Sequence, residues 1–488
     1  MSLRDQILDL ERESRRLEPT ADQREIARNS VISYSENFLS KIDSLKAYNQ
    51  TDDKGLALLD SPIGETGIGI DDAIELIREN VDRPGLNPAS GGHLAYIPGG
   101  GIYYSSLGDY LGDVFNRYAG VFYASPGAVR MENMLVRWLC DVVGYGPTSH
   151  GNLTTSGSLA NMIAVVVARD AKGIKSADIP RSVIYLSKQT HHSVDKAIRV
   201  AGLGECPIRY IELDERYKVR VEDLRAKIEA DKTAGLNPFL VVASAGTTDV
   251  GAIDPLVDIA DVAKEHELWY HIDAAYGGFF ILTKEGREKL IGLNLCDSVV
   301  IDPHKGLFLP YGLGVVLVRN VDDLKRSFSF EANYMQDAFT GIDELSPAEL
   351  SPELTKHFRG LRLWLPLKLH GVAPFRACLD EKLQLAKYFY EEVQKLGFES
   401  DLEPELSVVT YRWPMDKGDE FNKKLLGAVV ADGRVFISST TLKGKYTLRF
   451  ACLAFRTHLA TVDTLLKVLG ENVTQLLEMS SHGPSRSS

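Results

Sequence analysis

Lys305 ends a segment whose residue types suit amine chemistry. The segment Asp297–Lys305 (DSVVIDPHK) is an apolar run that delivers a His-Lys pair where a proline interrupts the pattern. A lysine after such a run is either a surface ammonium or a buried amine. A buried amine gives up its proton more easily and can attack carbonyl groups, which is how Schiff-base lysines arise.

A carboxylate occupies a comparable position 32 residues earlier. The apolar run 268–272 (LWYHI) ends in Asp273, which Ala274 and Ala275 follow. An isolated Asp of this kind is more simply a solvated turn residue. Beside a strand-end lysine it has the chemistry that pyridoxal phosphate (PLP) requires, because a carboxylate keeps the pyridine nitrogen protonated while the amine binds the aldehyde. The small neighbours of Asp273 would let a flat ring approach closely.

A Gly/Ser-rich segment offers an anion site. Residues 151–158 (GNLTTSGS) precede a predicted helix over 159–170. The N-terminus of a helix binds anions through its free N–H groups and its dipole, so Gly157 and Ser158 could hold a phosphate. The same residue types are also ordinary helix caps. No Gly-Lys-Ser/Thr follows them, so the segment is not a nucleotide P-loop.

Two further side chains could move protons. His191, in the pair His191-His192, could stack on a cofactor ring and relay protons, although a lone histidine is more often structural. Tyr334 lies in a polar, irregular segment (328–345) typical of a lid, where a tyrosine could act as a general acid. Its alternative is a surface tyrosine. The histidine spacing matches no metal motif, so no metal site is predicted.

The composition excludes several classes of protein. The chain has 488 residues, 44% of them hydrophobic and 25% charged, which is ordinary for a soluble globular protein with more than one packed unit. The net charge of −12 argues against a nucleic-acid binder. No apolar stretch approaches the ~20 residues that span a bilayer, and we see no secretory signal. Five widely spaced cysteines suit reduced thiols, so we expect a cytoplasmic protein. Because no long apolar stretch is present, we expect no membrane partner.

The pattern of apolar runs predicts an α/β fold. Short, nearly continuous apolar runs alternate with helical segments between about residues 90 and 320, which is typical of a mostly parallel sheet covered on both faces. The predicted strands are 182–187, 239–244, 269–272 and 298–301. In such sheets ligands bind at the carboxyl ends of the strands. The candidate residues His191, Thr247-Thr248, Asp273 and Lys305 all fall at these ends.

We expect four regions along the chain. Residues 1–85 form a helical N-terminal segment with a helix over 71–80, residues 86–370 a large α/β domain, residues 371–480 a small α+β domain, and residues 481–488 a disordered tail. In the small domain we expect strands at 406–412 and 447–453 and a final helix from about residue 460.

Together these motifs resemble the group II PLP-dependent amino-acid decarboxylases. Four segments carry the resemblance in the same order: QTHHSV (189–194), AGTT (245–248), HIDAAYG (271–277) and DPHK (302–305). The likeness covers at least residues 86–370, continues weakly to about 465, and is closest to bacterial aromatic amino-acid decarboxylases. It implies the PLP-dependent transferase fold (fold type I) with a seven-stranded sheet, and PLP as cofactor. It also implies a homodimer with shared active sites, in which the N-terminal segment contributes to dimerisation and pocket lining.

The resemblance assigns a role to each matching position. Lys305 corresponds to the Schiff-base (aldimine) lysine, Asp273 to the pyridinium partner, His191 to the stacking histidine and Tyr334 to the lid tyrosine that returns a proton. The implied cofactor-binding residues are Gly157, Ser158, His191, Thr248, Asp273, Ala275, Asp302, His304 and Lys305. The implied substrate-binding residues, partly across a dimer interface, are Tyr96, Pro98, Gly99, Gly306 and Arg449.

Three positions depart from the family pattern. Gly306 stands where animal and plant aromatic decarboxylases usually have Trp, and Gly99 stands where animal enzymes often have Thr. We expect these two glycines to enlarge or reshape the substrate pocket. Asp302 stands where many relatives have Asn, which places an acidic group near the phosphate.

The resulting hypothesis is α-decarboxylation of an L-amino acid. We favour a bulky aromatic substrate because Gly99 and Gly306 are small and few basic pocket residues are evident. Acidic amino acids stay open because glutamate-type relatives share the cofactor motifs. A second alternative is an oxidative aldehyde synthase on the same scaffold, in which the histidine or the lid tyrosine is often replaced. A third is another PLP enzyme, such as an aminotransferase, because fold alone does not determine the reaction.

Overall fold

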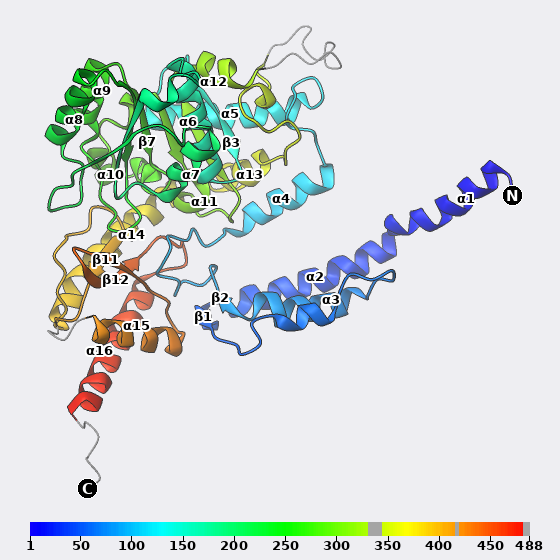
Figure 1. The fold of residues 1–488 in the computed structure, drawn as a ribbon. Coiled ribbons are helices and arrows are strands. Elements are labelled where there is room, and N and C mark those ends of the chain that lie inside the picture. The colour runs from blue at the N-terminus through cyan, green and yellow to red at the C-terminus, as the bar shows by residue number, and fades with distance from the viewer. Residues whose placement is uncertain (330–343, 415–418, 482–488) are drawn as a thin grey trace.

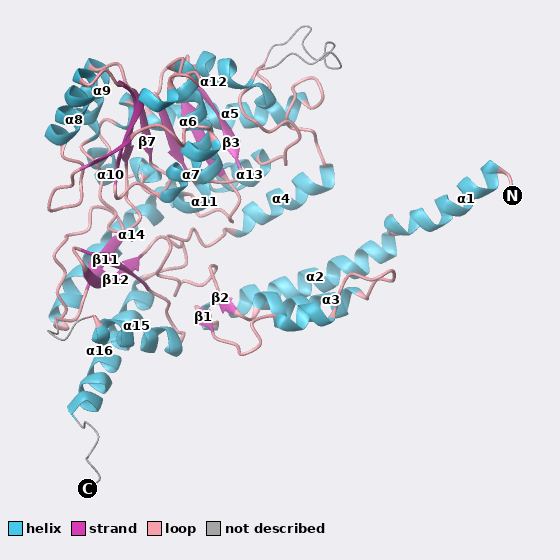
Figure 2. Ribbon diagram, in the orientation of Figure 1, coloured by secondary structure: helices cyan, strands magenta, loops and turns pink. Residues whose placement is uncertain are grey.

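A seven-stranded sheet forms the centre of the computed structural model, with the strand order β3-β9-β8-β7-β6-β4-β5. The structure describes residues 1–329, 344–414 and 419–481 (Figure 1). Helices lie on both faces of this sheet, and a smaller sheet with its own helices lies below it in the view (Figure 2). The N-terminal helices extend away from both (Figure 1).

The helices and strands follow one another in three groups. The N-terminal group comprises α1 (Leu3–Ser14), α2 (Ala21–Lys41), β1 (Tyr48–Asn49), α3 (Ile70–Ile77) and β2 (Gly85–Leu86). The central group comprises α4 (Tyr103–Phe115), α5 (Pro126–Val143), β3 (His150–Thr154), α6 (Gly157–Ala171), β4 (Ser182–Ser187), α7 (His192–Val200), β5 (Ile208–Ile211), α8 (Val221–Thr233), β6 (Asn237–Ser244), α9 (Leu256–Glu265), β7 (Trp269–Asp273), α10 (Lys284–Lys289), β8 (Ser298–Ile301), α11 (Pro303–Gly306), β9 (Gly314–Val318), α12 (Val321–Phe328) and α13 (Gly360–His370). The C-terminal group comprises α14 (Ala373–Lys395), β10 (Val408–Tyr411), α15 (Glu420–Asp432), β11 (Ser438–Leu442), β12 (Lys445–Ala451) and α16 (Leu459–Ser481).

The direction of the strands brings several chain turns to one edge of the large sheet. Strands β4, β6, β7 and β8 pair in parallel, and β5 pairs in parallel with β4. Strand β9 is antiparallel to both of its neighbours, β3 and β8, so β3 runs in the same direction as the parallel strands. The turns that follow β3, β4, β6, β7 and β8 therefore all lie at the carboxyl edge, where ligands bind in sheets of this kind.

Alternate residues of the central strands are buried on opposite faces of the sheet. In β4, Val183 and Tyr185 belong to the apolar core shared with α5, α8 and α9, whereas Ile184 and Leu186 belong to the core shared with α6 and α7. Such alternation follows from the two-residue period of a strand. It explains why these strands are nearly continuously apolar, because both faces are covered by helices.

The C-terminal group forms a second layer with its own core. Strands β10, β12 and β11 make a three-stranded antiparallel sheet in that order. The sheet packs against α14, α15 and α16 through a separate apolar cluster that includes Phe389, Tyr411 and Phe450. In the N-terminal group, β1 and β2 form a short antiparallel pair.

The prediction of an α/β fold with a mostly parallel seven-stranded sheet is confirmed. Strands β4 and β8 have the predicted bounds, and β6 and β7 extend their predicted segments by one or two residues at one end. The prediction contained no strand where β3 lies, because its sequence, HGNLT, is polar and contains glycine. β3 is nevertheless buried, since α5 and β9 cover it. No described helix has the length and apolar character needed to cross a bilayer.

Candidate active site

A cavity of about 150 Å³ opens at the carboxyl edge of the large sheet. It lies where the turns after β3, β4, β6, β7 and β8 meet. Its lining contains all nine residues that the sequence predicted for cofactor binding: Gly157, Ser158, His191, Thr248, Asp273, Ala275, Asp302, His304 and Lys305. Ser156, Asn161, Gln189, Ser193, Ser244, Gly246, Thr247 and Tyr276 complete it.

Lys305 enters the cavity from the short helix α11, which begins directly after β8. Its amine nitrogen lies 3.3 Å from Oδ2 of Asp302, and its side chain is 25% exposed. The amine is therefore neither a free surface ammonium nor fully buried, and it can reach a ligand in the cavity. An amine in this position can attack the carbonyl group of a bound molecule.

Asp302 is a buried acid between Lys305 and the start of α6. Its Oδ1 atom has no hydrogen-bond partner among the described residues. A Cβ atom built on Gly157 would lie 2.5 Å from Oδ2 of Asp302, so only a glycine permits this close approach. Burial raises the pKa of Asp302, while Lys305 and His304 act in the opposite direction. The Nδ1 atom of His304 lies 2.5 Å from the carbonyl oxygen of Leu313, to which it donates, and its Nε2 atom lies 3.6 Å from Asp302.

Asp273, the last residue of β7, is held at both carboxylate oxygens. Oδ1 accepts a hydrogen bond from the backbone N–H of Ala275 at 3.1 Å, and Oδ2 accepts one from the Asn161 amide at 2.9 Å. These two donors fix the orientation of the carboxylate in the cavity. A carboxylate in a fixed orientation can keep a bound ring nitrogen protonated, which is the requirement that the sequence suggested for PLP.

His191 caps the N-terminus of α7 with its own ring. Its Nδ1 atom accepts from the backbone N–H of Ser193 at 3.2 Å and lies 2.7 Å from the Ser193 hydroxyl. The ring also lies against His192, with centroids 4.1 Å apart. Burial lowers the pKa of His191, and the Asp273 carboxylate opposes this effect. The ring is therefore held neutral at the cavity wall.

Arg449 supports the cavity from behind rather than lining it. This buried side chain of β12 donates from Nη2 to the Thr248 carbonyl, from Nε to the Asp249 carbonyl at 2.9 Å, and from Nη1 to the Ser438 hydroxyl at 2.8 Å. The guanidinium therefore ties the turn after β6 to the small sheet. Arg449, which the resemblance assigns to substrate binding, does not line this cavity in the single chain.

The segment that contains Tyr96, Pro98 and Gly99 also lies outside the cavity lining. Tyr96 is 61% exposed, and both Tyr96 and Ile97 have positive φ angles of 52° and 56°. Such angles are strained for residues with a Cβ atom, above all for a β-branched isoleucine. The Tyr96 ring lies at the surface beside His93 and Phe436 and does not line the Lys305 cavity of its own chain.

Gly99 and Gly306, which we expect to enlarge or reshape the substrate pocket, are tightly packed in the single chain. A Cβ atom at Gly99 would lie 2.2 Å from the His304 carbonyl oxygen, and one at Gly306 would lie 2.5 Å from Cβ of Phe279. Other atoms of the chain therefore already fill the space that a side chain would take. The two glycines permit close packing around the turn that carries Lys305, and neither lines the cavity.

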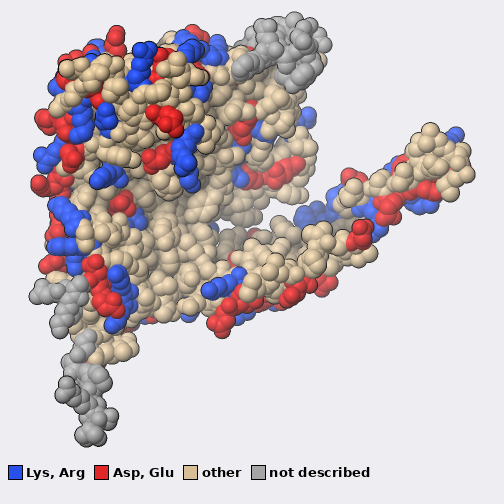
Figure 3. Space-filling view, viewed as in Figure 1, with Lys and Arg blue, Asp and Glu red and all other residues tan. Residues whose placement is uncertain are grey.

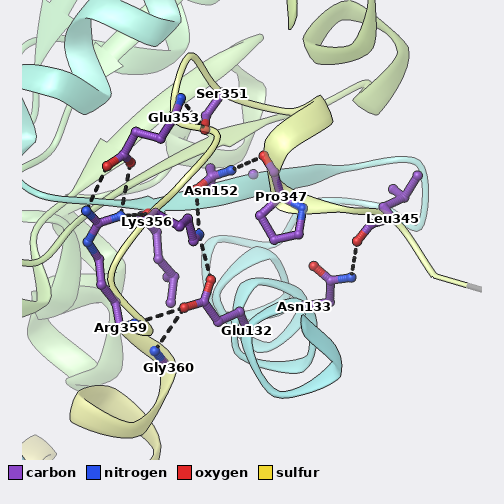
Figure 4. A network of polar contacts seen from close by, with 12 residues as sticks. Glu132, Asn133, Asn152, Leu345, Pro347, Ser351, Glu353, Lys356, Arg359 and Gly360 are labelled. Carbon is purple, nitrogen blue, oxygen red and sulfur yellow. Dashed lines mark hydrogen bonds and ion pairs between the residues drawn. The ribbon is translucent and has the colours of Figure 1, made fainter. Parts of the chain in front are cut away.

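Tyr334 lies outside the described residues. The chain that follows, from Glu344 to Gly360, is fixed to α5 and β3 by buried polar contacts (Figure 4). The Lys356 amine lies 2.6 Å from Glu132, whose other carboxylate oxygen accepts from the backbone N–H groups of Arg359 and Gly360. Asn152 of β3 joins the same group through its contact with Lys356 at 3.3 Å.

Asn161 and Ser193 were missed by the sequence reasoning although both line the cavity. Asn161 lies in α6, one turn after Gly157, and contacts Asp273, Ser193 and His271. One signal could have revealed it, because an asparagine in an otherwise apolar helix (GSLANMIAVVVARDA) needs buried hydrogen-bond partners. Among the described residues, no group of His, Cys, Asp or Glu has the arrangement of a metal site.

Comparison with known proteins identifies the class of this cavity. The pyridoxal-dependent decarboxylase conserved domain matches residues 71–413. An aromatic-L-amino-acid decarboxylase from Bacillus atrophaeus is 35% identical over 84% of this chain and 86% of the relative. The chain belongs to the pyridoxal-dependent decarboxylase family. It is a PLP-dependent carboxy-lyase.

Two further proteins are similar to this decarboxylase. An acidic amino acid decarboxylase from Xenopus tropicalis is 30% identical over 75% of this chain and 74% of the relative. The crystal structure of the Oryza sativa TDC with PLP and tryptamine superimposes with a TM-score of 0.88 at 24% identity, over 94% of this chain and 99% of that chain. At this identity the structural likeness establishes the fold.

The cavity of this decarboxylase fits PLP at each end. Asp273 presents a fixed carboxylate to a ring nitrogen, and Lys305 presents an amine to an aldehyde. Gly157 and Ser158 open helix α6, whose first N–H groups have no acceptors within the helix and favour an anion. The unpartnered Oδ1 atom of Asp302 points to the same place, because a protonated carboxyl there could donate to a phosphate oxygen.

Proposed function

We propose that this decarboxylase removes the carboxylate of an aromatic L-amino acid, such as Tyr, Trp, Phe or dihydroxyphenylalanine, and releases the amine and CO₂. The charge of the cavity lining carries the choice of an aromatic substrate. Among the described lining residues, Lys305 is the only Lys or Arg, whereas Asp273 and Asp302 are both acidic. Burying the second carboxylate of Glu or Asp beside these two acids would be costly without a cationic partner.

The side chains of the cavity would divide the reaction among them. PLP, when bound, supplies the electron sink that accepts the electrons left by CO₂. Lys305 would hold the cofactor through its amine and then yield that position to the amine of the substrate. Asp273 would accept a hydrogen bond from the protonated ring nitrogen. His191, together with Tyr334, would return a proton to the α-carbon.

Two other activities are the alternatives to this proposal. Decarboxylation of an acidic amino acid requires a cation in the substrate pocket, and a partner subunit could supply one. An oxidative aldehyde synthase would consume O₂ and release aldehyde, ammonia and peroxide. The presence of His191 at the cavity wall favours simple decarboxylation, because this position is often replaced in such synthases.

We also propose a cytoplasmic homodimer with shared active sites. Residues 1–41 bury almost nothing in the single chain, although they expose the large apolar side chains of Leu3, Ile7, Leu8, Leu10, Leu17, Ile26, Val31 and Ile32. Soluble proteins rarely leave so much apolar surface uncovered. Acidic side chains, with basic ones among them, lie along the lower edge of this arm in the view, and much of its upper side is uncharged (Figure 3). A second copy would cover it, and the exposed Tyr96, with Pro98, could then reach the cavity of the partner.

The three regions of the chain would have different roles in this dimer. We assign dimerisation to residues 1–85, cofactor binding to residues 86–370, and closure of the cavity from behind, through Arg449, to residues 371–480. The cytoplasmic location is supported by the cysteines, all five of which are free.

A substrate panel tests the proposed activity. The purified protein, loaded with PLP, is incubated with Tyr, Trp, Phe, dihydroxyphenylalanine, His, Glu and Asp, and amine and CO₂ are measured beside O₂ uptake. We expect an aromatic amino acid to give the highest kcat/KM, one CO₂ per amine, and no O₂ consumption. Preference for Glu or Asp, or stoichiometric O₂ uptake, would overturn the assignment. Lys305→Ala is expected to lose both turnover and the visible absorbance of the loaded protein.

A further inference from the structure

A buried row of polar side chains connects the Asp273 carboxylate to the interior of the sheet. Trp269, His271 and Asp273 alternate along β7 and so lie on one face of the sheet, beneath α6 and α7. Ser298 opens the neighbouring strand β8, where it is paired with His271. Polar groups this deeply buried need partners, and every member of the row has one.

The far end of the row favours one direction of its hydrogen bonds. The Trp269 ring nitrogen can only donate, and it donates to the Ser298 hydroxyl at 2.9 Å. The hydroxyl still has its own proton to donate, and the acceptor in reach among the described side chains is Nδ1 of His271, at 2.8 Å. Because Nδ1 accepts, the proton of a neutral His271 ring must lie on Nε2. Burial lowers the pKa of His271 to about 4, which keeps the ring neutral near pH 7.

The near end of the row demands the same direction independently. His271 Nε2 lies 2.9 Å from Oδ1 of Asn161 and donates to it. This orientation turns the Asn161 amide nitrogen to Asp273, at 2.9 Å. The reversed amide would place its oxygen at this short distance from a carboxylate oxygen, where two acceptors repel each other. The two ends of the row therefore select one orientation of Asn161.

Asn161 also contacts Ser193, the residue that orients His191. Its amide nitrogen also lies 3.0 Å from the Ser193 hydroxyl, which leaves the Ser193 proton free to bond to Nδ1 of His191 at 2.7 Å. The backbone N–H of Ser193 is directed to the same Nδ1 atom at 3.2 Å. With two donors at Nδ1, a neutral His191 carries its proton on Nε2.

We propose that Asn161 is a positioning residue that fixes both the Asp273 carboxylate and the protonated edge of His191. Its two amide hydrogens serve Asp273 and Ser193, so one side chain sets the orientation of the acid and, through Ser193, the tautomer of the histidine. His191 can then donate from Nε2 to a ligand in the cavity but cannot accept there. The inference deepens the proposed function and rests on it for the roles of Asp273 and His191.

The groups around His191 define the pH range in which this arrangement holds. The charged or titratable groups that face it are Asp273, His192, Lys305 and Lys196. Burial and the nearby cations keep His191 neutral, while Asp273 favours its protonation. The arrangement is therefore complete at neutral and alkaline pH, and protonation of the His191 ring disrupts it as the solution is made acidic.

The histidine tautomers of the wild-type protein give the first test. The full chain is labelled with ¹⁵N-histidine, and two-bond ¹⁵N–¹H spectra are recorded without and with PLP between pH 6.5 and 8.5. His191→Gln and His271→Gln variants identify the two signals among the 11 histidines. We expect both rings to be neutral with the proton on Nε2. A proton on Nδ1 of either ring, or a mixture of tautomers, overturns the proposal, and no turnover is needed for this result.

Variants provide the second test. Asn161→Leu keeps the approximate volume and removes all three contacts. We expect mixed tautomers at His191, a shifted pH profile of kcat, and a fall in kcat of at least about tenfold with KM changed much less. Unchanged His191 signals together with an unchanged pH profile overturn the proposal. If Asn161→Leu does not fold, Ser193→Ala replaces it, because that change removes only the hydroxyl that orients His191.

A matched control separates positioning from general destabilisation. Asn422 is another fully buried asparagine, whose side chain, among the residues that the structure describes, bonds to the backbone of Trp413. Asn422→Leu is expected to lower stability but to leave the His191 signals and the pH profile unchanged. Failure of the wild-type protein to decarboxylate any amino acid of the panel would instead overturn the proposed function, and the tautomer result would stand by itself.

Discussion

The carboxylate of Asp302 lies 3.3 Å from the amine of Lys305 and faces the glycine that opens α6. One acid thus contacts both the candidate Schiff-base lysine and the candidate phosphate site. An ionised Asp302 would pair favourably with a lysine ammonium but would repel a phosphate. The protonation of this one side chain therefore affects how well the cavity accepts PLP.

Asp302→Asn is expected to tighten PLP binding most strongly at high pH. Burial raises the pKa of Asp302, so the carboxyl is neutral below this raised value and becomes ionised as the pH increases. Ionisation weakens binding of an anionic phosphate in the wild-type protein, and the amide removes this effect. We expect the variant to bind PLP about tenfold more tightly at pH 8.5, equivalent to about 1.4 kcal/mol, with a smaller ratio at pH 6.

Fluorescence titration with PLP at both pH values measures this ratio. Asp297→Asn is the matched control, because Asp297 precedes the same strand at its opposite end and is a partly buried acid with a raised pKa. The control should leave the affinity for PLP unchanged. Weaker binding by Asp302→Asn at pH 8.5 would show that the acid contributes favourably to cofactor binding.

Gly306→Ala is expected to destabilise the fold, because the new Cβ atom would meet Cβ of Phe279 at 2.5 Å. Overpacking of this kind costs about 1–3 kcal/mol in the free energy of unfolding. Gly427→Ala in α15 is the matched control, since nothing lies within 4 Å of the added atom. There the better helix propensity of Ala should increase stability by about 1 kcal/mol. Urea unfolding measures both variants, and equal effects would contradict the close packing at Gly306.

His93→Phe is expected to increase the free energy of unfolding, and the increase should be larger at acidic pH. His93 is 0% exposed, and neither of its ring nitrogens has a partner among the described residues. Burial lowers the pKa of His93 to about 4. Between its ordinary value of 6.5 and about 4, the unfolded chain therefore binds a proton that the folded chain does not, and stability falls as the pH decreases.

The size of the effect follows from the same pKa. In acid, the variant avoids a loss of up to about 3 kcal/mol in the free energy of unfolding that the low pKa of His93 causes in the wild-type protein. At neutral pH, removal of the two unpartnered ring nitrogens should increase the free energy of unfolding by about 1–3 kcal/mol. The new ring would join Tyr96 and Phe436, which already surround His93. Thermal unfolding at pH 7.5 and pH 5 compares the two proteins. His271 keeps its own low pKa in the variant, so the acid slope should become shallower without disappearing, and an identical slope would contradict the prediction.

Lys356→Met is expected to cost about 3–5 kcal/mol, because it leaves the buried Glu132 carboxylate without its cation. The two side chains are 0% and 2% exposed and lie 2.6 Å apart. The double variant with Glu132→Gln should recover part of the loss. Lys424→Met removes an exposed partner of Glu420 and should change stability by less than about 0.5 kcal/mol. Chemical unfolding of the four proteins measures these differences, and equal losses at Lys356 and Lys424 would refute a structural role for the buried pair.

The sequence by itself determined four of the seven strands of the large sheet and the residues at their carboxyl ends. The strands β4, β6, β7 and β8 are nearly continuously apolar because helices cover both faces, and this pattern is visible without coordinates. Parallel strands present their carboxyl ends together, so the residues that follow them could be predicted to meet. Asp273 and Lys305 do meet at the same cavity.

Only the tertiary structure decided how these residues are held and which neighbours they have. The space expected at Gly99 is filled by the carbonyl group of His304, and the space expected at Gly306 is filled by the side chain of Phe279. In both pairs the two residues come from different parts of the chain. Asn161 lies 112 residues from Asp273, yet it donates to it. Hydrogen-bond partners and atomic clearances depend on three-dimensional packing between elements, which residue type and spacing do not specify.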